Sequence, residues 1–181
     1  MKHFIKFRVA IAMACPLLWF VADAQSQEKG NAQDEAGIRK VIDNLITAFN
    51  SHDVRALVGN FHIDAEFTNV IGMTAHGRME IEAFHKPLFA ANRPQGIPWF
   101  GNAVLKRDGE PVIRFLRPDV ATADHRWIMT GVVLPDGKEA PERKGLAIPV
   151  FTKANGEWAI ASFHNLEIDP AISTDAPKPL K

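Results

Sequence analysis

The hydrophobic pattern of this chain changes period once, near residue 98. Before that point, apolar residues recur every three to four positions, as on the buried face of an amphipathic helix. After it, runs rich in Val, Ile, Phe and Trp are separated by Asp-Gly and Asn-Gly pairs, which are typical of strands joined by tight turns. Helices followed by strands predict an α+β fold, in which three N-terminal helices pack on one face of a curved antiparallel sheet.

Three helices are expected in the first half of the chain. Asp34 is placed to cap the first helix, a second one ends near Phe61, and a third runs from Met79 to about Ala90. Residues 65–71 look extended, and a meander of four strands is expected after residue 98. Pro149 interrupts one of these strands and has no N–H to donate, which predicts a sheet edge or a bulge there.

The N-terminus has the pattern of a secretory signal peptide. Basic residues precede an apolar stretch too short to span a bilayer, and this stretch ends in Ala22-Asp23-Ala24. We therefore expect residues 1–24 to be a signal peptide of an exported, periplasmic or secreted protein, with no membrane segment in the mature form. The alternative is that Cys15, the only cysteine, is a lipoprotein anchor. Residues 25–33 are expected to be a flexible leader, residues 34–169 the domain, and residues 170–181 a disordered tail.

Charge and motif composition exclude several classes of function. The chain has 21 basic and 21 acidic residues and no basic run, so nucleic acid is not an expected partner. The histidines are scattered without the spacing of a metal site, and no metal is expected. Because the sequence contains no glycine-rich nucleotide motif, no P-loop and no serine-hydrolase elbow, no cofactor is expected either.

Several segments together resemble the NTF2-like superfamily, in particular its SnoaL-like branch often labelled SgcJ/EcaC. The segments are Ala48-Phe49-Asn50-Ser51-His52-Asp53, Asp64-Ala65-Glu66-Phe67-Thr68-Asn69, His76-Gly77-Arg78, Phe115-Leu116-Arg117-Pro118-Asp119-Val120-Ala121 and Asn155-Gly156-Glu157-Trp158. The resemblance implies a cystatin-like cone enclosing a pocket, and usually a homodimer through the exposed sheet face. This superfamily includes ketosteroid isomerases, cyclases, dehydratases and non-catalytic domains, so the fold alone names no reaction. The chain has no tyrosine, and therefore lacks the tyrosine donor of a ketosteroid-isomerase oxyanion hole.

Candidate catalytic residues follow from strand and helix periodicity. In residues 121–129 the odd positions are the apolar ones, which places His125, Trp127 and Met129 on the buried face. His85 lies on the inner stripe of the third helix. Each histidine could act in proton transfer or could be a core residue bonded to a backbone carbonyl. Asp64 could be a general base with a pKa raised by the pocket, or could cap the turn after the second helix.

Further pocket residues are less determined by the pattern. Asn69 could orient a substrate carbonyl, but a role in the turn before Gly72 is favoured. The last strand alternates on both faces, so the pattern leaves open which face lines the pocket. If Phe163 and Asn165 point inward, Asn165 is a pocket hydrogen-bonding residue and His164 belongs to an interface.

Three hypotheses for function follow. The first is a cofactor-independent enzyme that transfers protons on a small apolar organic molecule, as an isomerase, cyclase or dehydratase does. Asp64 or His125 would be its base, and His85 its partner acid or donor. The second is a binding or interaction module without chemistry. The third is a structural dimer whose pocket is filled by Trp99, Phe100 and Phe115.

Overall fold

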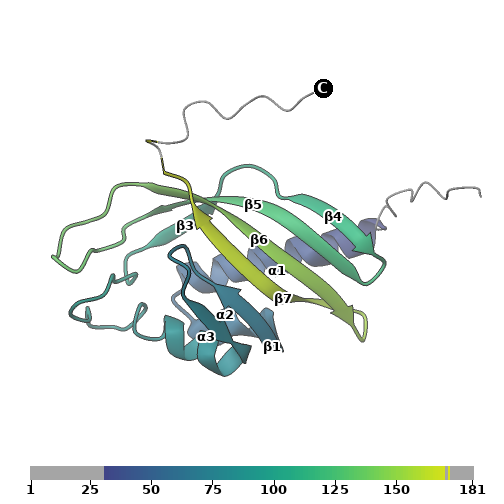
Figure 1. Ribbon diagram of the computed structural model, residues 1–181, viewed down its shortest axis with the longest axis horizontal. Coiled ribbons are helices and arrows are strands. Elements are labelled where there is room, and N and C mark those ends of the chain that lie inside the picture. The colour runs from purple at the N-terminus through teal and green to yellow at the C-terminus, as the bar shows by residue number, and fades with distance from the viewer. Residues whose placement is uncertain (1–30, 170, 172–181) are drawn as a thin grey trace, which may run out of the picture.

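The α+β fold is confirmed by the computed structural model, which describes residues 31–169 and 171. Three helices lie against one side of a seven-stranded sheet, and α1 crosses behind β5, β6 and β7 (Figure 1). The expected signal peptide, the leader up to residue 30 and nearly all of the tail lie outside the described residues. The elements are α1 (Ala32–Asn50), α2 (Val54–Gly59), β1 (Phe61–Thr68), β2 (Thr74–His76), α3 (Gly77–His85), β3 (Val104–Arg107), β4 (Val112–Arg117), β5 (Val120–Thr130), β6 (Arg143–Ala154) and β7 (Glu157–Glu167).

Helix α1 buries the predicted apolar stripe but begins earlier than expected. Its N-cap is Asn31, whose side chain accepts a hydrogen bond from the Asp34 N–H at 2.8 Å. The prediction that Asp34 is the cap is therefore wrong. Instead, the Asp34 carboxylate is buried, where it accepts hydrogen bonds from Lys153 Nζ at 2.5 Å and Trp158 Nε1 at 2.9 Å. These two hydrogen bonds hold the start of α1 against the β6–β7 hairpin.

The second and third helices are shorter than the sequence pattern predicts. Helix α2 ends at Gly59, so Phe61 already belongs to β1. Helix α3 ends at His85, five residues before the predicted end. Pro87 explains this early end, because it has no N–H to donate to the carbonyl oxygen four residues before it. The segment that follows continues as turns and still brings Leu88 and Phe89 against the core.

The sheet is mixed rather than wholly antiparallel. Its order is β2-β1-β7-β6-β5-β3, and β1 pairs with β7 in parallel. The expected four-stranded meander is thus a five-stranded segment, β3 to β7, extended by β1 and β2. The early extended segment joins the same sheet because residues 61–68 lie beside β7, the last strand of the chain.

Two of the three predicted turns connect neighbouring segments, and one does not. Asn155-Gly156 joins β6 to β7 with φ of 53° and 84°, as a two-residue hairpin turn requires. Asp136-Gly137 forms a turn in the long β5–β6 connection. Asp108-Gly109, however, separates β3 from β4, and both of these strands pair with β5 rather than with each other. This pair therefore marks an interruption in one edge of the sheet.

Strand β7 changes face at a bulge, which the simple alternation did not predict. Trp158 and Ile160 point into the core, and after a register shift opposite Val150 and Phe151 the inward residues are Phe163 and Asn165. Pro149 lies one residue from this shift. The bulge interpretation therefore fits its surroundings, whereas the edge interpretation is wrong because β6 is flanked by β5 and β7.

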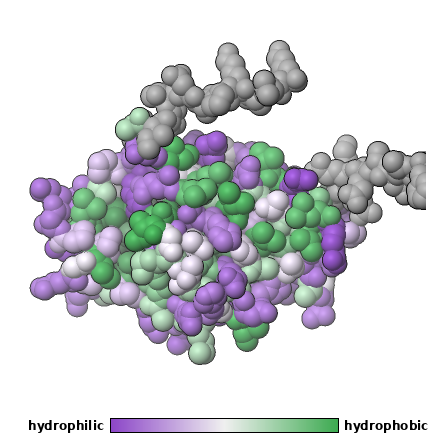
Figure 2. All heavy atoms as spheres, viewed as in Figure 1, coloured by the Kyte–Doolittle hydropathy of each residue, from purple (hydrophilic) through white to green (hydrophobic). Residues whose placement is uncertain are grey.

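The outer face of the sheet carries apolar residues among polar ones. Figure 2 shows hydrophobic side chains over the region where β5 to β7 lie in Figure 1. Leu146, Ile148 and Val150 are half-buried there, and Leu166 is 51% exposed. Within the described residues, the helices are too short or too polar to cross a membrane.

Candidate functional site

A cavity of about 550 Å³ lies between the helices and the inner face of the sheet. Its walls are mainly aliphatic and aromatic, and Phe67, Phe163 and Phe61 form a cluster on one side, with ring centroids 5.7 and 6.0 Å from that of Phe163. Phe100 lines this space without filling it, and Phe115 packs on Trp158 elsewhere in the core. The hypothesis of a pocket filled by Trp99, Phe100 and Phe115 is therefore wrong. A volume of this size is typical of sites for small organic molecules.

His85 enters the cavity wall from the last turn of α3. It is 8% exposed, and its ring lies 5.0 Å from that of Phe67 and 5.2 Å from that of Phe84. Its Nδ1 lies 2.7 Å from the carbonyl oxygen of Ile81. Burial lowers the pKa of His85, although the Ile81 carbonyl opposes this shift. The neutral ring therefore carries its hydrogen on Nδ1, because a carbonyl can only accept, which leaves the lone pair on Nε2.

His125 enters the same cavity from the middle of β5. It is 3% exposed, and its Nδ1 is buried with no hydrogen-bond partner in the described part of the chain. Burial, with the positive charge of Arg107, lowers the pKa of His125 to about 4, although Asp43 opposes the shift. The ring is therefore neutral at pH 7. We assign its hydrogen to Nε2, because burying an unpaired lone pair costs less than burying an unpaired N–H.

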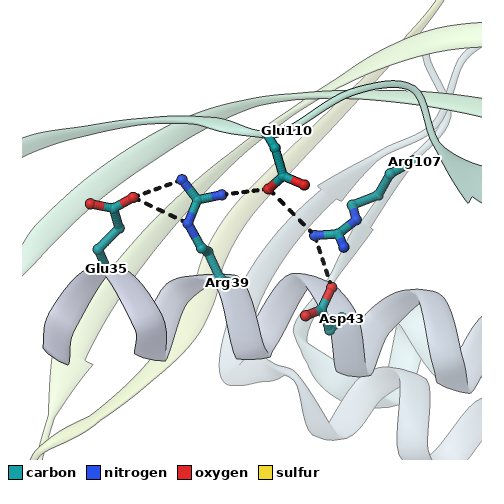
Figure 3. Close-up of polar contacts among 5 residues, drawn as sticks. All are labelled: Glu35, Arg39, Asp43, Arg107 and Glu110. Carbon is teal, nitrogen blue, oxygen red and sulfur yellow. Dashed lines mark hydrogen bonds and ion pairs between the residues drawn. The ribbon is translucent and has the colours of Figure 1, made fainter. Parts of the chain in front are cut away.

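A charged network between α1 and the end of β3 places a positive charge near His125. Arg39 on α1 bonds Glu35 at 2.7 Å and Glu110 at 3.0 Å, and Arg107 contacts Asp43 at 3.2 Å (Figure 3). Arg107 also approaches Glu110 at 3.9 Å. The network holds α1 against the interrupted strand edge and fixes the guanidinium that disfavours a proton on His125.

Trp127, Met129, Phe163 and Asn165 all line the cavity, as the sequence predicts for the first two and allows for the others. Trp127 Nε1 donates to Asn165 Oδ1 at 2.8 Å. An indole nitrogen only donates, so the amide oxygen of Asn165 faces Trp127 and its NH₂ group faces away. Asn165 thus lies on the inward face of β7, and His164 is exposed on the opposite face.

The two remaining predicted residues lie in different places, one at the cavity wall and one outside the cavity. Asn69 reaches the cavity wall, but its Oδ1 accepts hydrogen bonds from the N–H groups of Ile71 at 3.0 Å and Met73 at 2.8 Å, so the favoured turn role is the observed one. Asp64 lies within β1, is exposed, and is absent from the cavity lining. The strand starts at Phe61, so Asp64 points to the solvent side of the pleat and does not cap α2.

Arg143 is a cavity residue that sequence reasoning missed. It lies at the start of β6 and pairs with Glu167 through Nε at 2.6 Å and Nη2 at 2.8 Å. The hydrogen bond from Arg143 holds the pKa of Glu167 below its usual value. The signal in the sequence was alternation: Arg143 precedes Gly145 by two residues and Ala147 by four, so all three lie on the inward face of β6. Within residues 31–169, no cluster of three or more His, Cys, Asp or Glu is arranged to hold a metal ion.

Comparisons with solved structures agree with this architecture. An uncharacterised cystatin-like protein of Caulobacter vibrioides superposes with a TM-score of 0.69 at 22% identity, covering 79% of this chain and 95% of that one. A ketosteroid isomerase-like protein of Erwinia carotovora atroseptica gives 0.60 at 19% identity, covering 77% and 100%. A protein of Novosphingobium aromaticivorans, proposed to be a scytalone dehydratase, gives 0.60 at 14% identity, covering 75% and 85%. At these identities the likeness shows the fold alone.

Comparison with curated protein sequences finds no match. The model of the SnoaL-like domain family, in contrast, matches residues 30–164, which span both helices and sheet and include both cavity histidines. The chain therefore belongs to the SnoaL-like domain family.

Proposed function

We propose that this protein is a cofactor-independent enzyme that moves a proton within a small, mostly apolar molecule, as an isomerase, cyclase or dehydratase does. The observation that carries the proposal is the pair of neutral histidines in one apolar cavity. With the tautomers assigned above, His85 has an unprotonated Nε2 and His125 has an N–H at Nε2. One group can accept a proton while the other stabilises the charge that develops elsewhere on the substrate.

The Ile81 carbonyl determines which histidine is the base. It orients the His85 ring and fixes the hydrogen on Nδ1, so the Nε2 lone pair faces the substrate. When Nε2 takes a proton from carbon, the hydrogen bond to Ile81 also stabilises the resulting imidazolium. This assignment reverses the roles expected from the sequence, in which His85 was the donor. It also leaves Asp64 without a role, because Asp64 is outside the cavity.

The proposal predicts exchange of carbon-bound protons with solvent. The experiment incubates the protein in D₂O with a panel of cyclic ketones and β-dicarbonyl compounds, and measures deuterium incorporation by mass spectrometry. The wild-type protein should accelerate exchange, and His85→Gln should lower the rate on the order of 100-fold or more. Asp64→Asn, a charge-removing change at an exposed position, serves as the control and should leave the rate unchanged. Equal rates in the wild type, His85→Gln and His125→Gln would rule out this function.

A binding module without chemistry is the second candidate. Its support is that no Asp or Glu lines the cavity among the described residues, and that both imidazoles are weakly basic. Thermal stabilisation by a panel ligand without deuterium exchange would favour this candidate. We also propose that the chain lies on the SgcJ/EcaC branch of the family. We propose in addition that it is exported, which the intact mass of the protein secreted by its host would test.

A further inference from the structure

We propose that Asn165 is the donor that binds the carbonyl oxygen of the substrate, and that Trp127 and Gly145 are positioning residues that aim its amide into the cavity. The substrate class is then a ketone or enone whose enolate oxygen is held by Asn165 and His125 together. This inference rests on the proposed proton transfer and names the substrate class for the same site.

The register of the sheet places the two donors in one row. His125 on β5 is paired with Ala147 on β6, and Ala147 is paired with Asn165 on β7. All three residues line the cavity, and the small side chain of Ala147 leaves open the space between the other two. A single oxygen atom above Ala147 can therefore receive hydrogen bonds from both neighbouring strands.

The orientation of the Asn165 amide is set by Trp127. The Nε1–Oδ1 hydrogen bond of 2.8 Å occupies the amide oxygen, so the Nδ2 hydrogens are the part left for a ligand. Nδ2 has no protein partner within residues 31–169, and it is not among the buried polar atoms without partners. Nδ2 therefore has accessible surface, and Asn165 itself lines the cavity.

Gly145 leaves room for the Trp127 indole to reach Asn165 on β7. Gly145 is paired with Trp127 across the β5–β6 ladder, and a Cβ at this position would overlap the six-membered ring of Trp127 and the carbonyl oxygen of Leu166. The absence of a side chain lets the Trp127 ring lie across β6 toward β7. A glycine inside a strand commonly marks a close approach of this kind.

Arg143 also lines the cavity, but its donors already have a protein partner. Its Nε and Nη2 already donate to both carboxylate oxygens of Glu167. Asn165 and His125 are the neutral donors that flank Ala147, and their hydrogens have no protein acceptor among the residues described. In the proposed step, the α-carbon proton moves to His85 Nε2, and the electron pair of the C–H bond moves into the enolate. The negative charge then falls on the oxygen between Asn165 and His125.

A phenol probe tests the donor pair without any turnover. Para-nitrophenol resembles an enol, and its ionisation is read from the absorbance of the phenolate. The wild-type protein should bind the phenolate more tightly than the phenol, so that the apparent pKa of bound nitrophenol falls below that of free nitrophenol. His85→Gln should keep this preference, because His85 acts as base and not as donor to the oxygen.

Asn165→Asp is the decisive variant. It retains an oxygen that accepts from Trp127 Nε1 but replaces the NH₂ donor, and should weaken phenolate binding on the order of 10-fold to 100-fold. Asn69→Asp makes the same substitution at another position of the wall and controls for added negative charge; its effect should be much smaller. Trp127→Phe, which removes the indole N–H and part of the ring, and Gly145→Ala should each lower phenolate affinity several-fold. Circular dichroism checks folding, and Trp127→Phe keeps the test valid if Gly145→Ala does not fold.

Two outcomes would overturn the inference: wild-type protein with no preference for phenolate, or Asn165→Asp with unchanged phenolate affinity. Either result is distinguishable from failure of the proposed enzyme, which is read from deuterium exchange and from His85→Gln. Phenolate preference lost in Asn165→Asp, together with no exchange in the wild type, would leave a ligand site with this donor pair but no catalyst.

Discussion

At the scale of single residues, burial of His125 ties the stability of the fold to pH. The pKa of His125 is lowered from 6.5 to about 4 in the folded protein. Between these values the unfolded chain binds a proton that the folded chain does not, so the free energy of unfolding falls as the pH falls from about 6.5 to about 4. One group with a shift of this size accounts for about 3 kcal/mol at most. Above pH 6.5 this contribution is fully present.

Urea unfolding across this pH range measures the effect. His125→Gln should flatten the pH dependence between about 6.5 and 4, leaving the slope that the buried His85 causes in the same direction. His164→Gln, on the exposed outer face of β7, is the matched control and should retain the wild-type profile. A wild-type slope that persists in His125→Gln would contradict the assignment.

The sequence predicts which candidate residues are buried more reliably than it predicts which residues they form hydrogen bonds with. Strand alternation was enough to bury His125, Trp127 and Met129, and helix periodicity was enough to bury His85. The prediction for Asp64 failed because Asp64 was expected in the turn before an extended segment starting at residue 65, whereas β1 already starts at Phe61. Within the strand, Asp64 lies on the opposite face from the buried Ala65. The Trp127–Asn165 hydrogen bond joins residues 38 positions apart, and no local pattern encodes such a contact.

At the scale of elements, the β6–β7 hairpin depends on a turn that requires positive φ. Gly156 has φ of +84°, and nothing lies within 4 Å of a Cβ placed on it. Gly156→Ala should therefore destabilise the protein by about 1–2 kcal/mol through backbone strain alone. Gly59→Ala is a matched control, because its Cβ would also meet nothing within 4 Å while Gly59 is helical. Its stability should be unchanged or slightly raised. Equal losses measured by thermal unfolding would disprove the turn argument.

Element types were predictable, whereas pairings and ends were not. The Asn155-Gly156 turn and the apolar stripe of α1 are local signals, and both are confirmed. The parallel pairing of β1 with β7 brings together segments about 100 residues apart, a separation at which turn chemistry gives no guidance. The bulge in β7 depends on how this strand pairs with its neighbours β6 and β1. The sequence of β7 alone shows only that its apolar and polar residues alternate.

At the scale of the whole molecule, we propose that two copies associate through the outer sheet face. Leu146, Ile148 and Val150 run along β6 on the side away from the helices, with Leu166 beside them on β7. Ile148→Glu would place a charge at the centre of this surface and should convert a dimer to a monomer in sedimentation velocity. Thr130→Glu, at the exposed end of β5, should leave the dimer intact. A wild-type protein that sediments as a monomer at all concentrations would contradict the proposal.

The cavity is a property of the complete fold, because α1, α3, β1 and the inner faces of β5 to β7 all contribute to its wall. Ala147 lies in the row between the two donors and is 1% exposed. Since the space in front of it is open, Ala147→Leu should fill part of the cavity without the usual strain of an enlarged core residue, and the melting temperature should be unchanged or higher. The same change should abolish nitrophenol binding and deuterium exchange, because the leucine occupies the place of the ligand oxygen. Ala154→Leu, at the exposed end of β6, provides the control and should preserve both. If Ala147→Leu bound the probe as the wild type does, the ligand could not sit against the central strands, and the site would have to be placed nearer the mouth of the cavity.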